Sequence, residues 1–309
     1  MGQGRIGNRA ASVVSWLRTT MRLPVKQVQQ MMQPVDALTL SVGEIVGLTQ
    51  AVAETGQATV RAINQAILAQ PHVHMDETGW REDGDNGYVW AMSTPNGLRA
   101  YIFRFSRAAA IPEKILEGFT GTLVTDFYAA YNPTDGKHQR GWAHLLRDLR
   151  ELDQEHRMHD PDLPAWITAL IQTYRDGVAL VERDPPPTPT ERQALFDSLV
   201  EQVRVLGLRW PQDKGHPAHA MRKRLLRHEA ELFEFALQPG LAPTNNLAER
   251  SVRPLVIARK ISGGTRSERG SNTRMDLQTL FATWTAQGKS VLDHCFSMLA
   301  NPAVPLLQV

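Results

Sequence analysis

Apolar and polar residues alternate with helical spacing near the start of the chain. Apolar side chains recur every three or four positions over residues 13–21 and again over residues 25–32. This spacing places them on one face of an α-helix, so two short amphipathic helices are predicted. Pro24 and Pro34 follow these segments and are expected to end them, because proline lacks a backbone N–H and clashes with the preceding turn.

A second helical signal begins at Ser41. Ser41 and Glu44 have the spacing of a capping box, in which each side chain accepts a hydrogen bond from the other residue's backbone. No proline interrupts the pattern from there to Leu68, so one long helix is predicted. Residues 1–70 are thus expected to form an all-α region. Two interpretations stay open, a helix-turn-helix that binds DNA and a packed structural cap.

The pattern changes to strands after Pro71. Three β-rich runs are separated by turn sequences that contain Gly, Asp and Asn, which predicts an antiparallel meander over residues 72–80, 88–94 and 98–106. A helix, a fourth strand that carries an aspartate, a fifth short strand and another helix are expected next, over residues 108–117, 121–131, 139–143 and 145–156.

This order of elements indicates an α/β fold of the ribonuclease H-like class, with a mixed five-stranded sheet and flanking helices. In that fold the first strand and the strand after the first helix are neighbours. Asp76 in the first strand and Asp126 in the fourth are therefore expected to lie side by side, although fifty residues separate them. Residues 71–160 form the first part of this predicted core.

Residues 161–240 return to a helical pattern that proline-rich stretches interrupt, which predicts an all-α insertion into the core. Its last helix, expected over residues 221–237, begins with four cations that either contact phosphate or face solvent. Residues 241–309 are predicted to complete the core. An Asn or Thr near their start is expected to cap a helix that carries Glu249 in its early turns, and Pro254 is expected to end or kink that helix.

Composition limits the functions that such a fold can serve. The chain has 309 residues, of which 42% are hydrophobic and 21% are charged, an ordinary globular composition that can bury a core. Its net charge of +2 excludes a basic coat for nucleic acid. The single cysteine, Cys295, excludes an internal disulfide framework, and no apolar run approaches membrane-spanning length. We expect a cytoplasmic protein without a membrane partner.

Positive charge is concentrated near the C-terminal end of the sequence. From Arg250 to Arg274 there are seven basic residues and one acidic residue, Glu268, which gives a local charge of +6. Because the whole chain carries only +2, this cluster favours a polyanionic partner such as nucleic acid. A solvated basic face is the alternative.

Three carboxylates are candidates for metal chemistry, namely Asp76, Asp126 and Glu249. Magnesium prefers oxygen ligands and keeps several waters, so two or three carboxylates and a substrate phosphate complete its shell. Two such ions about 4 Å apart can activate an attacking oxygen and stabilise the leaving oxygen in phosphodiester chemistry. Mg²⁺ or Mn²⁺, as a pair of ions, is the expected cofactor.

Four motifs carry a family resemblance. They are MDETGW around Asp76, GTLVTDFYAAY around Asp126, WAHLLRDL around His144, and NNLAERSVRPLVIARK around Glu249 followed by GGTRS. Together, and in this order, they resemble the transposases of the insertion sequence 66 family, a branch of the Asp-Asp-Glu transposases. The resemblance extends over residues 10–299.

That resemblance implies a DNA transposase that performs magnesium-dependent cleavage at transposon ends and strand transfer into target DNA. Asp76, Asp126 and Glu249 become the implied catalytic triad and metal ligands. The implied partners are double-stranded DNA, further copies of the chain as a homo-oligomer on that DNA, and accessory proteins of the same element, at the nucleoid of a bacterial cytoplasm. The implied DNA contacts are polar and basic residues around and after the glutamate: Asn246, Arg250, Arg253, Arg259, Lys260 and Arg266.

The chain departs from the family pattern at two motif positions. Gly141 stands where a cysteine is common before Trp-Ala-His, and Thr244 stands where an aspartate is common before Asn-Asn. The coiled-coil and cysteine-rich zinc segments of longer members have no match here. A truncated copy or a divergent branch that depends on another protein is therefore one expectation. Two rival functions also stay open, a catalytically inactive DNA-binding remnant and a ribonuclease H-like nuclease that cuts without joining.

Overall fold

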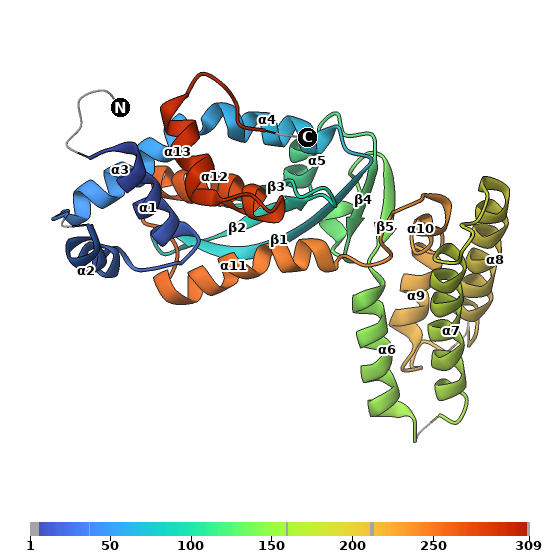
Figure 1. Cartoon of the computed structure of the whole chain (residues 1–309). Coiled ribbons are helices and arrows are strands. Elements are labelled where there is room, and N and C mark those ends of the chain that lie inside the picture. Colours follow the sequence, from blue (N-terminus) through green and yellow to red (C-terminus); the bar gives the residue numbers. More distant parts are fainter. Residues whose placement is uncertain (1–5, 37, 159, 211–212, 308–309) are drawn as a thin grey trace. The chain divides into compact units, whose positions relative to one another are not determined.

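The computed structural model of the chain describes residues 6–36, 38–158, 160–210 and 213–307 (Figure 1). The strands are β1 (His72–Glu82), β2 (Asp85–Ser93), β3 (Arg99–Arg104), β4 (Thr122–Thr125) and β5 (Lys137–Arg140). The helices that precede or flank them are α1 (Asn8–Thr19), α2 (Val25–Asp36), α3 (Val42–Thr55), α4 (Gln57–Leu68), α5 (Ala110–Ile115), the 3-10 helix η1 (Ala129–Tyr131) and α6 (Trp142–His156). The later helices are α7 (Leu163–Val181), α8 (Pro189–Gly207), α9 (His219–Arg227), α10 (Glu234–Leu237), α11 (Asn246–Ser262), α12 (Glu268–Ala286) and α13 (Val291–Ala300).

The five strands form the mixed sheet that the element order predicted, and the strand order is β3-β2-β1-β4-β5. Strands β1, β2 and β3 pair antiparallel, whereas β4 and β5 pair parallel. The β1–β2 hairpin turns through Asp83 and Gly84, whose φ angles are 51° and 94°. Both central residues of a tight hairpin turn need positive φ, which an Asp-Gly pair tolerates, so the predicted turn is confirmed.

Two of the strands are shorter than predicted. Strand β4 ends at Thr125, and the residues after Asp126 form η1 instead of further strand. Strand β5 ends at Arg140, because the backbone N–H of Gly141 bonds the Thr125 carbonyl at 2.8 Å and α6 already begins at Trp142. The predicted strand over residues 139–143 was therefore displaced toward the N-terminus.

The N-terminal region is helical, as predicted, with two corrections. The capping box is present, since Ser41 N–H bonds Glu44 Oε2 at 2.8 Å and Glu44 N–H bonds Ser41 Oγ at 3.1 Å. The single helix expected from there is divided at Gly56, where an added Cβ would lie 2.5 Å from the Leu280 side chain on α12. Pro34 does not end α2 but lies two residues before its end.

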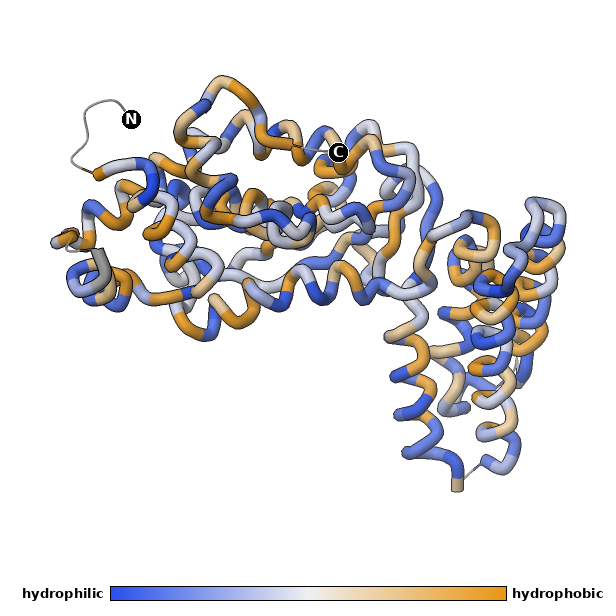
Figure 2. The backbone as a smooth tube through the Cα atoms, in the orientation of Figure 1, coloured by the Kyte–Doolittle hydropathy of each residue, from blue (hydrophilic) through white to orange (hydrophobic). Residues whose placement is uncertain are grey.

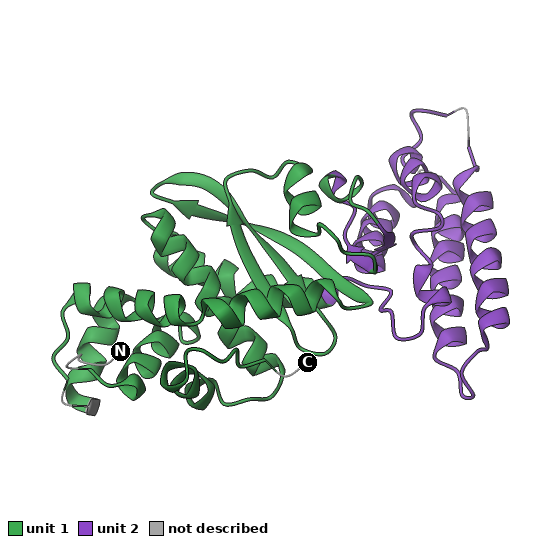
Figure 3. Cartoon of the chain, turned by 90° about the horizontal axis from the view of Figure 1, so that it is seen from above, with its two compact units in different colours: residues 1–121, 130–135, 247–309 green, residues 122–129, 136–246 purple. Residues whose placement is uncertain are grey.

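The chain divides into two compact units, which Figure 3 distinguishes by colour. Unit 1 comprises residues 1–121, 130–135 and 247–309, and unit 2 comprises residues 122–129 and 136–246. The N-terminal helices thus belong to the same unit as the C-terminal helices. The side-chain amide of Gln57 on α4, for example, donates to Asp276 Oδ2 on α12 at 2.5 Å.

Helices cover both faces and one edge of the strands in unit 1. Helix α11 packs its Val252, Leu255 and Ala258 side chains against the face that carries Val89 and Ala91. Helices α4 and α5 meet the opposite face. Helix α12 lies along the edge strand β3, where Thr hydroxyls at positions 279 and 283 accept the backbone N–H groups of strand residues 101 and 99, each at 3.0 Å. These bonds satisfy edge groups that otherwise invite pairing with another chain.

Unit 2 contains the predicted helical insertion. Hydrophobic and hydrophilic residues alternate along its helices (Figure 2), and Trp142, Trp166 and Phe233 are among its buried side chains. The helix predicted over residues 221–237, the last of the insertion, was too long, because α9 ends at Arg227 and α10 begins only at Glu234. Among the described helices of the whole chain, none is both long and apolar enough to cross a membrane.

One cation of α9 is not available to phosphate. Arg222 is 5% exposed, and its Nε and Nη1 donate to the carbonyls of Gly207 and Trp210 at 2.9 and 2.7 Å. Its guanidinium therefore joins α9 to the end of α8 instead of facing a ligand.

Candidate active site

Strand β1 presents Asp76 on the face that α11 covers. Asp76 pairs with Ala91 of β2, and paired residues on neighbouring strands point to the same side of a sheet. Ala91 packs in the cluster that contains Val252 and Leu255 of α11. Asp76 is half-buried, and its Oδ1 accepts the backbone N–H of Glu77 at 2.8 Å, which orients the carboxylate.

Glu77 points to the opposite side of β1 and forms a buried polar group there. Its side chain is 3% exposed and forms an ion pair with Arg107, whose Nε lies 3.0 Å from Glu77 Oε1. The hydroxyl of Tyr131, a fully buried residue, donates to the other carboxylate oxygen. The Tyr131 ring meets Trp90 edge to face, with 5.9 Å between the ring centroids. The segment at Tyr131 is thereby fixed to β1 beside Asp76.

Sequence reasoning did not identify Glu77, Tyr131 and Arg107. One signal was present, because an acidic residue next to Asp76 in a predicted strand must point to the other face and needs a buried partner there. No local pattern indicates that this partner is a tyrosine fifty-four positions away.

Asp126 lies in unit 2, directly after β4. Its Oδ1 accepts the backbone N–H of Tyr128 at 2.9 Å, so the side chain closes the local turn that ends the strand. The Asp126 carbonyl accepts a bond from Arg140 Nη1 at 3.1 Å. Arg140 is 1% exposed, and its Nε also lies 2.6 Å from Glu231 Oε2.

The carboxylate of Glu231 is held ionised beside this arginine. Partial burial raises the pKa of Glu231, but hydrogen bonds and charge from His228 and Arg140 outweigh that effect and lower the pKa to about 2. The backbone around Asp126 is therefore supported by a charge-assisted network that remains ionised at neutral pH.

Glu249 lies in the first turn of α11. Asn245 is buried and directly precedes the helix, in the capping position that the sequence predicted for Thr244 or Asn245. Pro254 does not end the helix, which continues through it to Ser262. A Cβ on Gly141 would lie 3.0 Å from the Asn245 backbone nitrogen, so the glycine of the Trp-Ala-His motif permits a close approach of these two segments.

Helix α11 contacts the strands on both of its flanks. On one flank, Arg250 lines a pocket with Arg99 and Tyr101, which belong to β3. On the other flank, Arg259 Nη1 donates to the Gly79 carbonyl of β1. Glu249 is half-buried at the start of this helix.

Two of the three predicted ligands lie in unit 1. Asp76 lies on the face of β1 that α11 covers, and Glu249 lies in the first turn of α11. Asp126 belongs to unit 2. Within the described residues, no three His, Cys, Asp or Glu side chains already form a metal-binding group.

The predicted DNA contacts differ in exposure. Arg259 is half-buried against β1, so part of its role is structural. The others are exposed, namely Asn246, Arg250, Arg253, Lys260 and Arg266. Arg269 and Arg274 also contribute to the +6 cluster. Arg269 is exposed and forms an ion pair with Glu54 at 2.8 Å, whereas Arg274 is half-buried and donates to the Arg18 carbonyl at 3.0 Å.

The mixed five-stranded sheet, its flanking helices and its helical insertion define an α/β protein of the ribonuclease H-like class. The family model described as "Transposase IS66 family" matches residues 3–273, and the chain belongs to this family. It is also 29% identical over 225 residues to the "Uncharacterized protein y4qI" of Sinorhizobium fredii (strain NBRC 101917 / NGR234). That alignment covers 66% of the chain but 40% of the relative, so the chain spans well under two thirds of that protein.

Proposed function

We propose that this chain is a DNA transposase, or the core of one, that cleaves phosphodiester bonds at transposon ends and joins those ends to target DNA. Membership of the IS66 transposase family supports this function. One observation supports particular residues: Asp76 lies on the face of β1 that α11 covers, and Glu249 lies in the first turn of α11, 173 residues later in the chain.

Asp126 is proposed as the third member of the triad. Its closeness in the chain to Tyr131 supports this assignment, because Tyr131 follows Asp126 by five residues and bonds Glu77, the neighbour of Asp76. The strand order of the sheet is also that of the ribonuclease H-like fold.

The donor set fits a hard divalent cation. All three side chains are carboxylates, and magnesium and manganese prefer such oxygen ligands. Asp76 and Asp126 each use Oδ1 to accept a backbone N–H, and a carboxylate offers about four acceptor positions in all. Mg²⁺ or Mn²⁺, when bound as a pair, supplies Lewis-acid activation of the attacking oxygen and stabilises charge on the leaving oxygen.

The chain's own residues provide positioning and charge in this proposal. The backbone amides of Glu77 and Tyr128 orient two carboxylates, and the start of α11 holds the third. Exposed cations on α11 and the following loop, such as Arg253 and Lys260, attract the DNA backbone. Double-stranded DNA is thus the proposed substrate, and assembly of several copies and accessory proteins on it is part of the same proposal.

A strand-transfer assay tests the function. The purified chain is incubated with a labelled transposon-end duplex, a supercoiled target and Mg²⁺, and the joined product is quantified. Asp76→Asn should abolish joining, whereas Asp85→Asn, at an exposed position of the β1–β2 hairpin, should leave it unchanged. Cutting without joining would instead indicate a nuclease, and DNA binding with neither activity would indicate an inactive remnant.

A further inference from the structure

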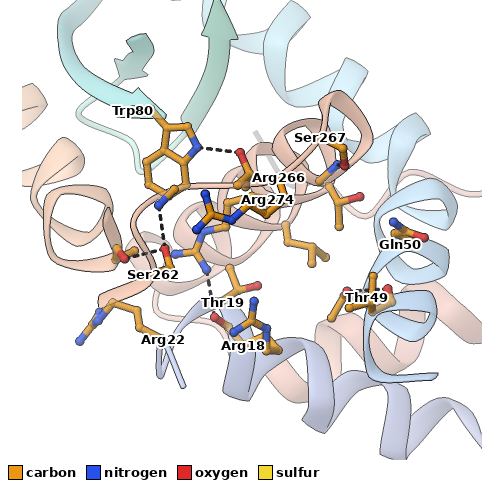
Figure 4. Close-up of a pocket in the computed structure, with 17 residues that line it drawn as sticks. Arg18, Thr19, Arg22, Thr49, Gln50, Trp80, Ser262, Arg266, Ser267 and Arg274 are labelled. Atoms are coloured by element: carbon orange, nitrogen blue, oxygen red, sulfur yellow. Dashed lines mark hydrogen bonds between the residues drawn. The ribbon is translucent and has the colours of Figure 1, made fainter. Parts of the chain in front are cut away.

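A cavity of about 280 Å³ lies within unit 1, apart from the three acidic residues (Figure 4). Its wall is assembled from distant parts of the sequence. The end of α1 and the middle of α3 form one side, Trp80 of β1 and the end of α11 form another, and the Gly263–Ser267 loop and the first half of α12 complete it. The volume is close to the roughly 300 Å³ at which small-ligand sites begin.

Every charged side chain among the described residues that line this cavity is positive. Four arginines contribute to it, namely Arg18, Arg22, Arg266 and Arg274, and no acidic residue is among the described residues that line it. None of the four forms an ion pair within the described part of the chain. Like charges gathered at a partly desolvated site raise the free energy of the folded state unless an anion compensates them.

Arg274 shows this imbalance most directly. Its Nη1 donates to the Arg18 carbonyl at 3.0 Å, whereas its Nε is buried and has no hydrogen-bond partner among the described residues. Burial, together with the nearby charges of Arg18 and Arg22, lowers the pKa of Arg274 to about 10. A guanidinium held in this way is suited to receive an anionic ligand.

Neutral donors lie beside the arginines. Helix α12 begins at Glu268 next to the cavity, after its cap Ser267, whose Oγ accepts the Gly270 N–H at 3.2 Å. Amides in the first turn of a helix and the positive end of its dipole favour anions. Thr273 adds a hydroxyl to the wall. The Trp80 indole supplies a flat apolar surface, and its Nε1 donates to Thr265 Oγ1 at 3.1 Å. A phosphate group that carries a small organic part matches this combination.

We propose that this cavity is a binding site for a phosphate group, held by the guanidinium groups of Arg18, Arg22, Arg266 and Arg274. The same chemistry is offered by a phosphate of the DNA backbone and by the phosphate of a free nucleotide. In either case the ligand joins the N-terminal helices to α12, because the arginines come from both. The site is independent of the proposed cleavage reaction, since binding requires neither the three acidic residues nor a metal.

The test measures binding of inorganic phosphate to the full chain without divalent metal, by calorimetry and by the shift of the thermal midpoint. Arg22→Gln and Arg266→Gln remove charges that make no hydrogen bond within the described residues, so folding should be preserved. Arg61→Gln, at an exposed position of α4, is the matched control. Sodium chloride at equal ionic strength controls for general screening.

Phosphate should raise the midpoint with a saturable dependence in the unmodified chain and in Arg61→Gln, and each cavity variant should bind at least tenfold more weakly. Equal binding in all variants, or an effect that sodium chloride reproduces, would overturn the proposal. Competition distinguishes the two sources. Displacement of phosphate by a short duplex identifies a DNA phosphate, whereas displacement only by a deoxynucleoside monophosphate identifies a free nucleotide. An Asp76→Asn chain should bind phosphate normally, which separates this result from failure of the proposed catalysis.

Discussion

The bond between Tyr131 and Glu77 fixes the segment after Asp126 to the strand that carries Asp76. Tyr131→Phe removes only the hydroxyl that donates to the Glu77 carboxylate and keeps the edge-to-face contact with Trp90. Glu77 is 3% exposed, so water cannot replace the lost donor, although the Arg107 ion pair remains. A hydrogen bond to a charged group contributes about 1.5–3 kcal/mol, and the expected loss of unfolding free energy is therefore about 2 kcal/mol.

The same substitution should reduce activity by more than the loss of folded protein accounts for. A carboxylate displaced by about 1 Å can lower a rate by roughly a hundredfold, because the positions of the reacting groups set much of the barrier. Strand transfer by Tyr131→Phe should thus fall by about 10- to 100-fold under conditions in which the chain remains folded. Denaturant unfolding followed by tryptophan fluorescence measures the stability, and the strand-transfer assay measures the activity.

Tyr88→Phe is the matched control, because its ring lies under the Arg107 guanidinium at 5.6 Å and its hydroxyl has no bond within the described residues. This control should retain both stability and activity. If Tyr131→Phe also retained both stability and activity, Tyr131 would not position Asp126 in the proposed triad.

Three further predictions concern charge, packing and pH. Arg253→Ala should weaken DNA binding and reduce the slope of log affinity against log salt concentration by about 1. Arg259→Ala should have the same effect and should also destabilise the chain, because it removes the bond to the Gly79 carbonyl of β1. An unchanged slope in both variants would identify a solvated face. Gly56→Ala places a Cβ 2.5 Å from the end of the Leu280 side chain on α12, which must move, and should cost about 1 kcal/mol of unfolding free energy; an unaltered denaturation midpoint would contradict this expectation. Burial raises the pKa of Asp276 from 3.8 to about 6 despite the hydrogen bond from Gln57. The folded chain then binds a proton more tightly, so this contribution to stability is present below pH 3.8 and is lost as the pH rises through about 6. Relative to the unmodified chain, Asp276→Asn should gain roughly 2–3 kcal/mol between pH 4 and pH 7, and parallel stability curves would contradict the assignment.

The sequence predicted the elements whose signals are local. The capping box at Ser41, the Asp-Gly hairpin after β1 and the helix that carries Glu249 depend on neighbouring residues, and all three are present. Errors occurred where a distant contact decided the outcome. Gly56 lies between α3 and α4, where a side chain of α12 leaves no room for a Cβ, and no pattern around Gly56 indicates this contact.

The same distinction applies to the candidate site. Asp76 and Glu249 were predicted from motifs, and both lie in unit 1, Asp76 on the face of β1 that α11 covers and Glu249 in the first turn of α11. The buried partners of Glu77 and the arginine-lined cavity were not predicted, because each joins residues far apart in the sequence. Local charge counting also treated Arg274 as a surface cation, whereas it lies against the end of α1.

We propose that Asp76, Asp126 and Glu249 hold the same divalent metal ions, and metal-directed backbone cleavage tests this proposal. Fe²⁺ replaces Mg²⁺ in the full chain, ascorbate and peroxide generate hydroxyl radicals at the bound iron, and mass spectrometry locates the cuts. We predict cuts close to all three residues, suppressed by excess Mg²⁺ and absent in Asp126→Asn. Cuts near Asp76 and Glu249 that persist unchanged in Asp126→Asn, or no cuts near any of the three, would contradict the claim.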